Sequence, residues 1–222
     1  MGFGTRLHSA GMVFQQMGAA SFLTRVLPWS LRRDYSIFAQ NLDVLIAFPP
    51  PTFPCLIRSA GRDDIPAIRA LQKGYYARDI LLGRLEAGYM GFLGWSGEDL
   101  IYIQWIFTGT FAIPYLHGRL ALGQKEAYSD EVFTRPDFRG AGVYAHASFL
   151  VRKSLREKGF RRLYAAVASW NSVPRQNMIR SGMMEIAEFR RQPPPIFGKW
   201  RWSGGIETHD DGTFSFRFEA PR

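Results

Sequence analysis

Cysteine is almost absent from this sequence of 222 residues, in which Cys55 stands alone. A single cysteine excludes an internal disulfide framework and a cysteine-based zinc site, and it is typical of a reducing compartment. Apolar runs of about 20 residues, the length that spans a bilayer, are also missing, because charged residues, glutamine or proline interrupt every candidate. We therefore expect a soluble, cytoplasmic protein that holds no metal.

Basic residues outnumber acidic ones, with 28 Lys and Arg against 19 Asp and Glu, a net charge of +9 and a pI near 10.0. Such a surplus attracts polyanions, which include nucleic acid, an anionic membrane surface and a phosphorylated ligand. A hydrophobic content of 46% excludes a disordered chain. The net charge therefore predicts an anionic ligand, but it does not distinguish nucleic acid, a membrane surface and a phosphorylated small molecule.

The chain divides at a proline-rich stretch over residues 49–54, which predicts an extended linker. Before it, residues 1–48 combine helical apolar periodicity with arginines, and we predict a helical extension that packs on the domain. A basic amphipathic segment of this kind also fits a membrane surface, which is the alternative. After the linker, residues 55–222 form the main domain.

Within this domain, apolar periodicity and turn signals predict an alternation of strands and helices. A short strand is expected from Cys55, and further strands near 88–95, 99–109, 126–136, 161–171, 184–192, 199–205 and 212–218, with helices over 63–76, 143–160 and 172–180. Residues 110–125 are expected to be irregular. This order predicts an α/β (α+β) fold, a mixed sheet with helices on its faces.

The stretch RPDFRGAGVY, residues 135–144, lies between a predicted strand and a predicted helix. Amides at the start of a helix lack intrahelical partners and carry partial positive charge. Gly140 and Gly142 remove side chains that would hold an anion away, while Arg135 and Arg139 add charge. The stretch lacks the Gly-Lys-Ser/Thr of a Walker loop and the third glycine of a dinucleotide fingerprint. A diphosphate cradle and a plain tight turn both fit these residues.

The flanks of this stretch resemble the GNAT superfamily, the acetyl-CoA-dependent N-acyltransferases. Pro136-Asp-Phe-Arg-Gly-Ala-Gly142 resembles the family's motif A, and Trp170-Asn171 and Ser181-Gly182-Met183 stand at the separations of a later family strand and helix. The resemblance covers about residues 56–191. It implies a GNAT-like, mostly antiparallel sheet, and acetyl-CoA or another acyl-CoA as co-substrate.

The resemblance also implies which residues hold the cofactor. Backbone of Val132, Phe133 and Thr134 would pair with the pantetheine arm, and an amide near Val132 would stabilise the oxyanion. The pyrophosphate would lie on the amides of Gly140, Gly142, Val143, Tyr144 and Ala145, and Arg139 and Ala141 belong to the same cofactor-binding turn. Asn171 would either bond the cofactor arm or cap the next helix. Two positions depart from the family: Tyr144 stands where Gly or Ala is usual, and Met178 replaces the tyrosine that serves many members as general acid.

A general base must remove a proton from the amine. Glu126 coincides with the base position of one branch of the family. The alternative is that Glu126 is a solvated carboxylate at the start of a strand, with no catalytic role. Glu131, Tyr128, Asp130 and His117 are the alternatives.

These observations predict an acyl-CoA-dependent N-acyltransferase that moves an acetyl group to an unidentified amine. One alternative is a membrane-associated acyltransferase with a longer acyl chain or a lipid or glycan-linked acceptor, and another is a non-enzymatic basic binding module. We expect no nucleic acid partner, because the basic residues do not gather with aromatics into a strip. The sequence leaves open a homodimer and a peripheral membrane contact through residues 1–48.

Overall fold

An eight-stranded sheet forms the centre of the computed structural model, which describes residues 34–116, 118–191 and 200–218. Its strands, in spatial order, are β10 (Trp200–Gly204), β9 (Met184–Arg191), β1 (Tyr35–Asn41), β8 (Arg162–Ala168), β7 (Glu126–Thr134), β4 (Asp99–Phe107), β3 (Met90–Ser96) and β2 (Leu56–Ser59). All neighbours are antiparallel except β7 and β8, which run parallel. The predicted mixed, mostly antiparallel sheet is confirmed.

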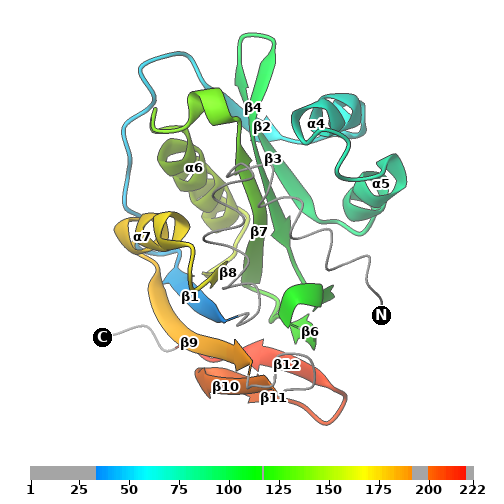
Figure 1. Cartoon of the computed structure of the whole chain (residues 1–222), viewed down its shortest axis with the longest axis vertical. Helices are drawn as coiled ribbons and strands as arrows, with labels where there is room; N and C mark the ends of the chain where they lie inside the picture. The colour runs from blue at the N-terminus through cyan, green and yellow to red at the C-terminus, as the bar shows by residue number, and fades with distance from the viewer. Residues whose placement is uncertain (1–33, 117, 192–199, 219–222) are drawn as a thin grey trace.

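Helices cover both faces of this sheet (Figure 1). Helices α6 (Val143–Glu157) and α7 (Ser172–Arg180) lie on one face, and α4 (Ile65–Leu71) and α5 (Arg78–Glu86) lie on the other. The alternation of Leu163, Ala165 and Val167 along β8 places these three side chains under α6 and α7, in clusters with Val151 and Met178. The alternating apolar residues predicted for this strand thus form the face that α6 and α7 cover.

A second, four-stranded sheet packs on the α4 and α5 face, at the lower end of Figure 1. Its order is β11 (Ile206–Thr208), β12 (Thr213–Phe216), β6 (Gly118–Ala121) and β5 (Thr110–Ile113). The expectation of an irregular stretch over 110–125 is therefore wrong for β5 and β6. Phe111 and Ile113 alternate with exposed residues, as in a half-buried strand, but a strand of four residues is too short for this period to stand out in the sequence.

The predicted helical extension over 1–48 is wrong for residues 35–41, which form β1 between β8 and β9. Ile37, Phe38 and Ala39 are fully buried, and a strand buried on both faces shows no period-2 alternation that distinguishes it from a helix. Consequently residues 49–54 connect two strands of one sheet and do not separate an extension from the domain. Residues 1–33 of the predicted extension lie outside the described residues. No described helix is long and apolar enough to cross a membrane.

The sheet parts between β7 and β8. Their parallel pairing runs from Glu126 and Arg162 to Ser129 and Ala165 and then stops, although β7 continues to Thr134. Beyond that point β7 stays with β4 and β8 stays with β1. A bulge accompanies the parting, because the register of β7 against β4 shifts by one residue and Glu131 has a φ of 53°. A bulge bends and twists its strand, which turns β7 away from its neighbour.

Candidate active site

The turn from β7 to α6 begins with a short 3-10 helix, η4 (Pro136–Phe138), and ends in two left-handed glycines. Gly140 has a φ of 80° and Gly142 a φ of 81°, conformations that favour glycine. A Cβ atom added to either would meet no atom of the described residues within 4 Å. The backbone of this turn is therefore open to a ligand on the side where side chains would otherwise stand.

Most amides of this turn have no hydrogen-bond acceptor among the described residues. The first amide of α6 with a backbone acceptor is that of His146, which donates to the Gly142 carbonyl over 3.1 Å. In the described part of the chain, the amides of residues 140–145 donate to no acceptor. With the dipole of a 15-residue helix behind them, these amides suit a pyrophosphate.

The two arginines of the turn are placed differently. Arg135 forms ion pairs with Asp99 at 3.0 Å and Asp137 at 2.9 Å, so its charge is largely neutralised. The Arg139 guanidinium donates to the Thr134 carbonyl over 3.1 Å and thereby ties the turn to the end of β7. Phe53 stacks edge-on against Phe138 at 5.3 Å, so the proline-rich connection packs on the turn as well.

From residue 130 onward, the edge of β7 that faces β8 makes no ladder pairs with described residues. The residues predicted to pair with pantetheine, Val132, Phe133 and Thr134, lie on this stretch, and Phe133 and Thr134 pair only with β4, on the other edge. The open edge, the bulge and the glycine turn follow one another along the chain.

Asp130 lies at the point where the strands part. Its Oδ2 accepts a hydrogen bond from the Tyr115 hydroxyl over 3.1 Å, and its Oδ1 accepts the Glu131 amide over 2.8 Å. The hydroxyls of Tyr115 and Tyr128 are 2.6 Å apart. Burial and the nearby Glu131 charge raise the pKa of Asp130 to about 7. A carboxyl that titrates near neutral pH suits a general base.

Next to Asp130, Glu131 forms a two-pronged ion pair with Arg84 of α5, with one N–O distance of 2.7 Å. The Arg84 guanidinium also lies over the rings of Tyr76 at 4.3 Å and Trp105 at 5.1 Å. Both partners are largely buried, with side-chain exposures of 12% and 14%. The pair fixes the left-handed Glu131 and so holds the bulge in place.

No protein-family model and no curated protein sequence matches this chain significantly. Solved structures do match it. A GCN5-related N-acetyltransferase from Sphaerobacter thermophilus aligns with a TM-score of 0.51 and 15% identity, covering 79% of this chain and 56% of that one. A Drosophila protein aligns with a TM-score of 0.50 and 13% identity, covering 69% and 48%. The aminoglycoside N-acetyltransferase AAC(6′)-Iy, solved with CoA, aligns with a TM-score of 0.49 and 17% identity, covering 62% and 93%.

The chain has the GNAT fold. It spans about half the length of the Sphaerobacter and Drosophila chains. The sequence resemblance to this superfamily, drawn from the glycine turn and its flanks, is confirmed at the level of the fold.

The departures from the GNAT pattern are explained by packing. The Tyr144 ring packs with Ile101, Tyr102 and Ala147 beneath α6 and does not obstruct the glycine turn, and burial raises the pKa of its hydroxyl. Met178 is buried with Phe38 and Val167, so this position serves the core. Asn171 precedes α7, and its side chain makes no capping hydrogen bond.

Glu126 lies at the start of β7, in the paired part of the strands and away from the parting. Its Oε1 accepts bonds from Arg162 at 3.1 Å and Tyr164 at 3.0 Å, and its Oε2 accepts the Gly123 amide at 2.9 Å. The sequence favours Glu126 over Asp130 as the base, because spacing along the chain cannot show where two strands separate. His117 lies outside the described residues.

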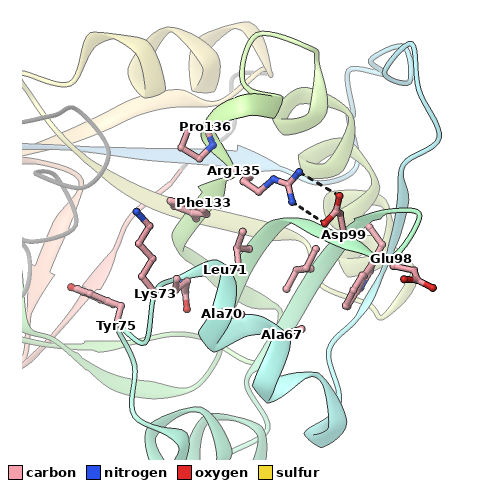
Figure 2. Close-up of a pocket in the computed structure, with 13 residues that line it drawn as sticks. Ala67, Ala70, Leu71, Lys73, Tyr75, Glu98, Asp99, Phe133, Arg135 and Pro136 are labelled. Carbon is pink, nitrogen blue, oxygen red and sulfur yellow. Dashed lines mark hydrogen bonds and ion pairs between the residues drawn. The ribbon is translucent and has the colours of Figure 1, made fainter.

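A pocket of about 460 Å³ opens beside the end of β7, on the α4 face of the sheet. Figure 2 shows Lys73 and Tyr75 at one end and the Arg135–Asp99 pair at the other, with Phe133 between them. We call it the α4 pocket; it is lined by Ala67, Ala70, Leu71, Gln72, Lys73, Tyr75, Trp95, Glu98, Asp99, Leu100, Phe133, Arg135 and Pro136. Its size is within the range of about 300–1,000 Å³ of small-molecule sites.

Proposed function

We propose that this protein is an acyl-CoA-dependent N-acyltransferase that moves an acetyl group to an amine. The observation that carries the proposal is the parting of β7 from β8 directly before an open glycine turn. A parted sheet edge offers backbone groups to an extended chain, and the turn offers unpaired amides to a pyrophosphate. A CoA ester presents both in this order.

The residues fit such a ligand. The amides of residues 140–145 would hold the pyrophosphate, and the open space at Gly140 and Gly142 would admit it. The free edge of Val132, Phe133 and Thr134 would pair with the pantetheine arm. When bound, the thioester supplies an acyl carbonyl and a thiolate leaving group.

We assign the general base to Asp130, which takes a proton from the amine as the new C–N bond forms and the C–S bond breaks. Its pKa of about 7 leaves it partly ionised at neutral pH, and Tyr115 and the Glu131 amide orient its two oxygens. The Val132 amide, beside the bulge, would donate to the carbonyl oxygen as negative charge develops there. Glu131 positions the strand, and Glu126 ties β7 to β8.

The other predictions concern the acceptor and the setting. A longer acyl chain, a homodimer, a cytoplasmic location and membrane contact through residues 1–48 stay predictions.

Incubation with acetyl-CoA and a panel of primary amines tests the proposal. Released CoA thiol, followed with a thiol reagent, should appear in step with an N-acetylated amine detected by mass. If CoA thiol appears at the same rate without any amine, the protein hydrolyses acetyl-CoA. If no amine of the panel leads to release of CoA thiol, the result counts against acetyl transfer.

A further inference from the structure

The proposed transfer leaves two protons to be placed. Asp130 gains a proton from the amine, and it must lose that proton before the next turnover. The C–S bond breaks to give a CoA thiolate, which must gain a proton to leave as a thiol. A group that bonds Asp130 and also reaches the departing sulfur would meet both needs in one step.

Tyr115 lies across the parting of the sheet. Its hydroxyl donates to the Asp130 carboxylate of β7 over 3.1 Å, and its ring packs against Tyr35 of β1, with 5.1 Å between the ring centroids. Tyr35 pairs with Ala168 of β8, beyond the point where the ladder between β7 and β8 ends. Tyr115 therefore contacts both sides of the gap that a thioester bound along the free edge of β7 would enter.

The second sheet holds Tyr115 in this place. Tyr115 belongs to a short 3-10 helix, η3 (Pro114–Leu116), which joins β5 to β6. Its neighbours Ile113 and Leu116 are buried in the core, whereas Tyr115 is only half-buried. The Tyr128 hydroxyl lies 2.6 Å from that of Tyr115, but Tyr128 is fully buried. Of these two hydroxyls, that of Tyr115 is the one placed to meet a substrate.

We propose that Tyr115 is a second catalytic residue, which carries the proton from Asp130 to the departing thiolate. As the amine attacks, its proton moves to Oδ2 of Asp130 and the C–S bond breaks. The Tyr115 hydroxyl proton moves to the sulfur, and the Asp130 proton moves along the existing hydrogen bond to the Tyr115 oxygen. Both side chains regain their starting protonation, and the products are an N-acetylated amine and CoA thiol. This inference rests on the proposed acetyl transfer.

The order of acidities favours this relay. Burial, with the Asp130 charge next in effect, raises the pKa of Tyr115 well above its usual value of about 10, so the hydroxyl keeps its proton until the thiolate forms. The net transfer starts from the Asp130 carboxyl, whose pKa is about 7. It ends on a thiolate whose conjugate acid, like a cysteine thiol, has a pKa of about 8.5. The proton thus moves from the stronger acid to the stronger base, and Tyr115 supplies the path.

Two matched variants test the relay. Tyr115→Phe and Tyr128→Phe each remove one hydroxyl from the same 2.6 Å contact, but only Tyr115 bonds Asp130. We expect Tyr115→Phe to lower kcat about 100-fold, at the lower end of what general acid–base catalysis contributes, with the affinity for acetyl-CoA unchanged. Tyr128→Phe should keep most of its turnover. Equal losses of kcat in the two variants, or full activity of Tyr115→Phe, would overturn the relay.

The comparison of kcat is made on the pH plateau. The Tyr115 hydrogen bond lowers the pKa of Asp130, so its loss should move the acid limb of Tyr115→Phe to higher pH. At a pH above that limb, Asp130 is ionised in both proteins, and a remaining loss of kcat reports the missing proton transfer. A loss of kcat that disappears on the plateau would reduce Tyr115 to a residue that only tunes Asp130, and would overturn the relay.

The solvent isotope effect separates a relay from a structural role. In mixtures of H₂O and D₂O, kcat of the wild type should vary with the deuterium fraction along a curve, because several protons move together. Tyr115→Phe should give a straight line, because one transfer, from the amine to Asp130, remains. The same dependence in both proteins would overturn the relay.

The same assays distinguish this inference from the proposed function. If the wild type acetylates an amine and Tyr115→Phe matches its kcat, the relay is wrong and the transferase proposal stands. If the wild type binds acetyl-CoA but acetylates no amine of the panel, both are wrong.

Discussion

Glu131 on β7 is joined to Arg84 on α5 by two hydrogen-bonded contacts, one of 2.7 Å, and its own amide bonds the neighbouring Asp130 carboxylate. The pair therefore links a helix on the α4 face to the point where the sheet parts. It also surrounds Asp130 with opposed charges, because the Glu131 charge raises the pKa of Asp130 and the Arg84 charge lowers it.

Breaking this ion pair from either side should shift the pH–rate profile in opposite directions. Glu131→Gln removes a negative charge and should move the acid limb of kcat/KM to lower pH. Arg84→Gln removes a positive charge and should move that limb to higher pH. Tyr75, Tyr115 and Tyr128 also interact with Asp130, and they stay the same in both variants. If both variants moved the acid limb in the same direction, the Arg84–Glu131 pair would act through the fold and not through the pKa of Asp130.

Replacing the base should reduce turnover more than binding. Asp130→Asn should lower kcat about 100- to 10,000-fold with acetyl-CoA affinity unchanged, because proton transfer is lost and the turn is intact. Glu126→Gln is the matched control, since Glu126 bonds Arg162 and Tyr164 in the closed part of the strands. Full activity of Asp130→Asn would remove it from the mechanism, and a larger loss in Glu126→Gln would restore the prediction made from sequence.

Asp130 should also make stability fall as pH rises. Its pKa of about 7 in the folded protein exceeds the value of about 3.9 in an unfolded chain, so ionisation disfavours the fold. The free energy of unfolding should therefore decline between about pH 4 and pH 7. Asp130→Asn should be more stable than the wild type above pH 7 and equal to it near pH 4, as measured by urea unfolding. A variant less stable at pH 8 would contradict this sign.

The place of residues 35–41 within the sheet has its own test. Phe38 is fully buried in β1, and Phe38→Ala should lower the free energy of unfolding by about 3–5 kcal/mol. Val44→Ala is the control, because Val44 is 70% exposed and should change that free energy by less than about 0.5 kcal/mol. If Phe38→Ala changed the free energy of unfolding only slightly, residues 35–41 would not be a buried strand, and the predicted peripheral extension would be supported.

The sequence predicts local features of this molecule better than distant ones. The glycine turn, the hairpin of β3 and β4 and the helix over Ser172–Arg180 follow from turn residues, apolar periodicity and capping, which act between near neighbours. The place of β1 between β8 and β9 depends on pairing across more than 120 residues, which no local pattern encodes.

The same limit applies to the site. Val132–Thr134 and residues 139–144 could be proposed because they lie on one continuous stretch. Asp130 owes its raised pKa to burial and to the Glu131 charge, and Glu131 is itself held by Arg84, which is 47 residues away along the chain. Similarly, the α4 pocket joins residues 67–75, 95–100 and 133–136, which only the folded chain brings together.

Thermal unfolding in the presence of acetyl-CoA tests the central claim most directly. Millimolar acetyl-CoA should raise the Tm of the wild type, because it binds the folded state alone. Gly142→Glu places a carboxylate in the turn and should remove that shift. Gly159→Glu is the matched control, because Gly159 is also a left-handed glycine with open space around it, at the other end of α6, and this variant should keep the shift. A wild type whose Tm does not respond to any CoA ester would contradict the account.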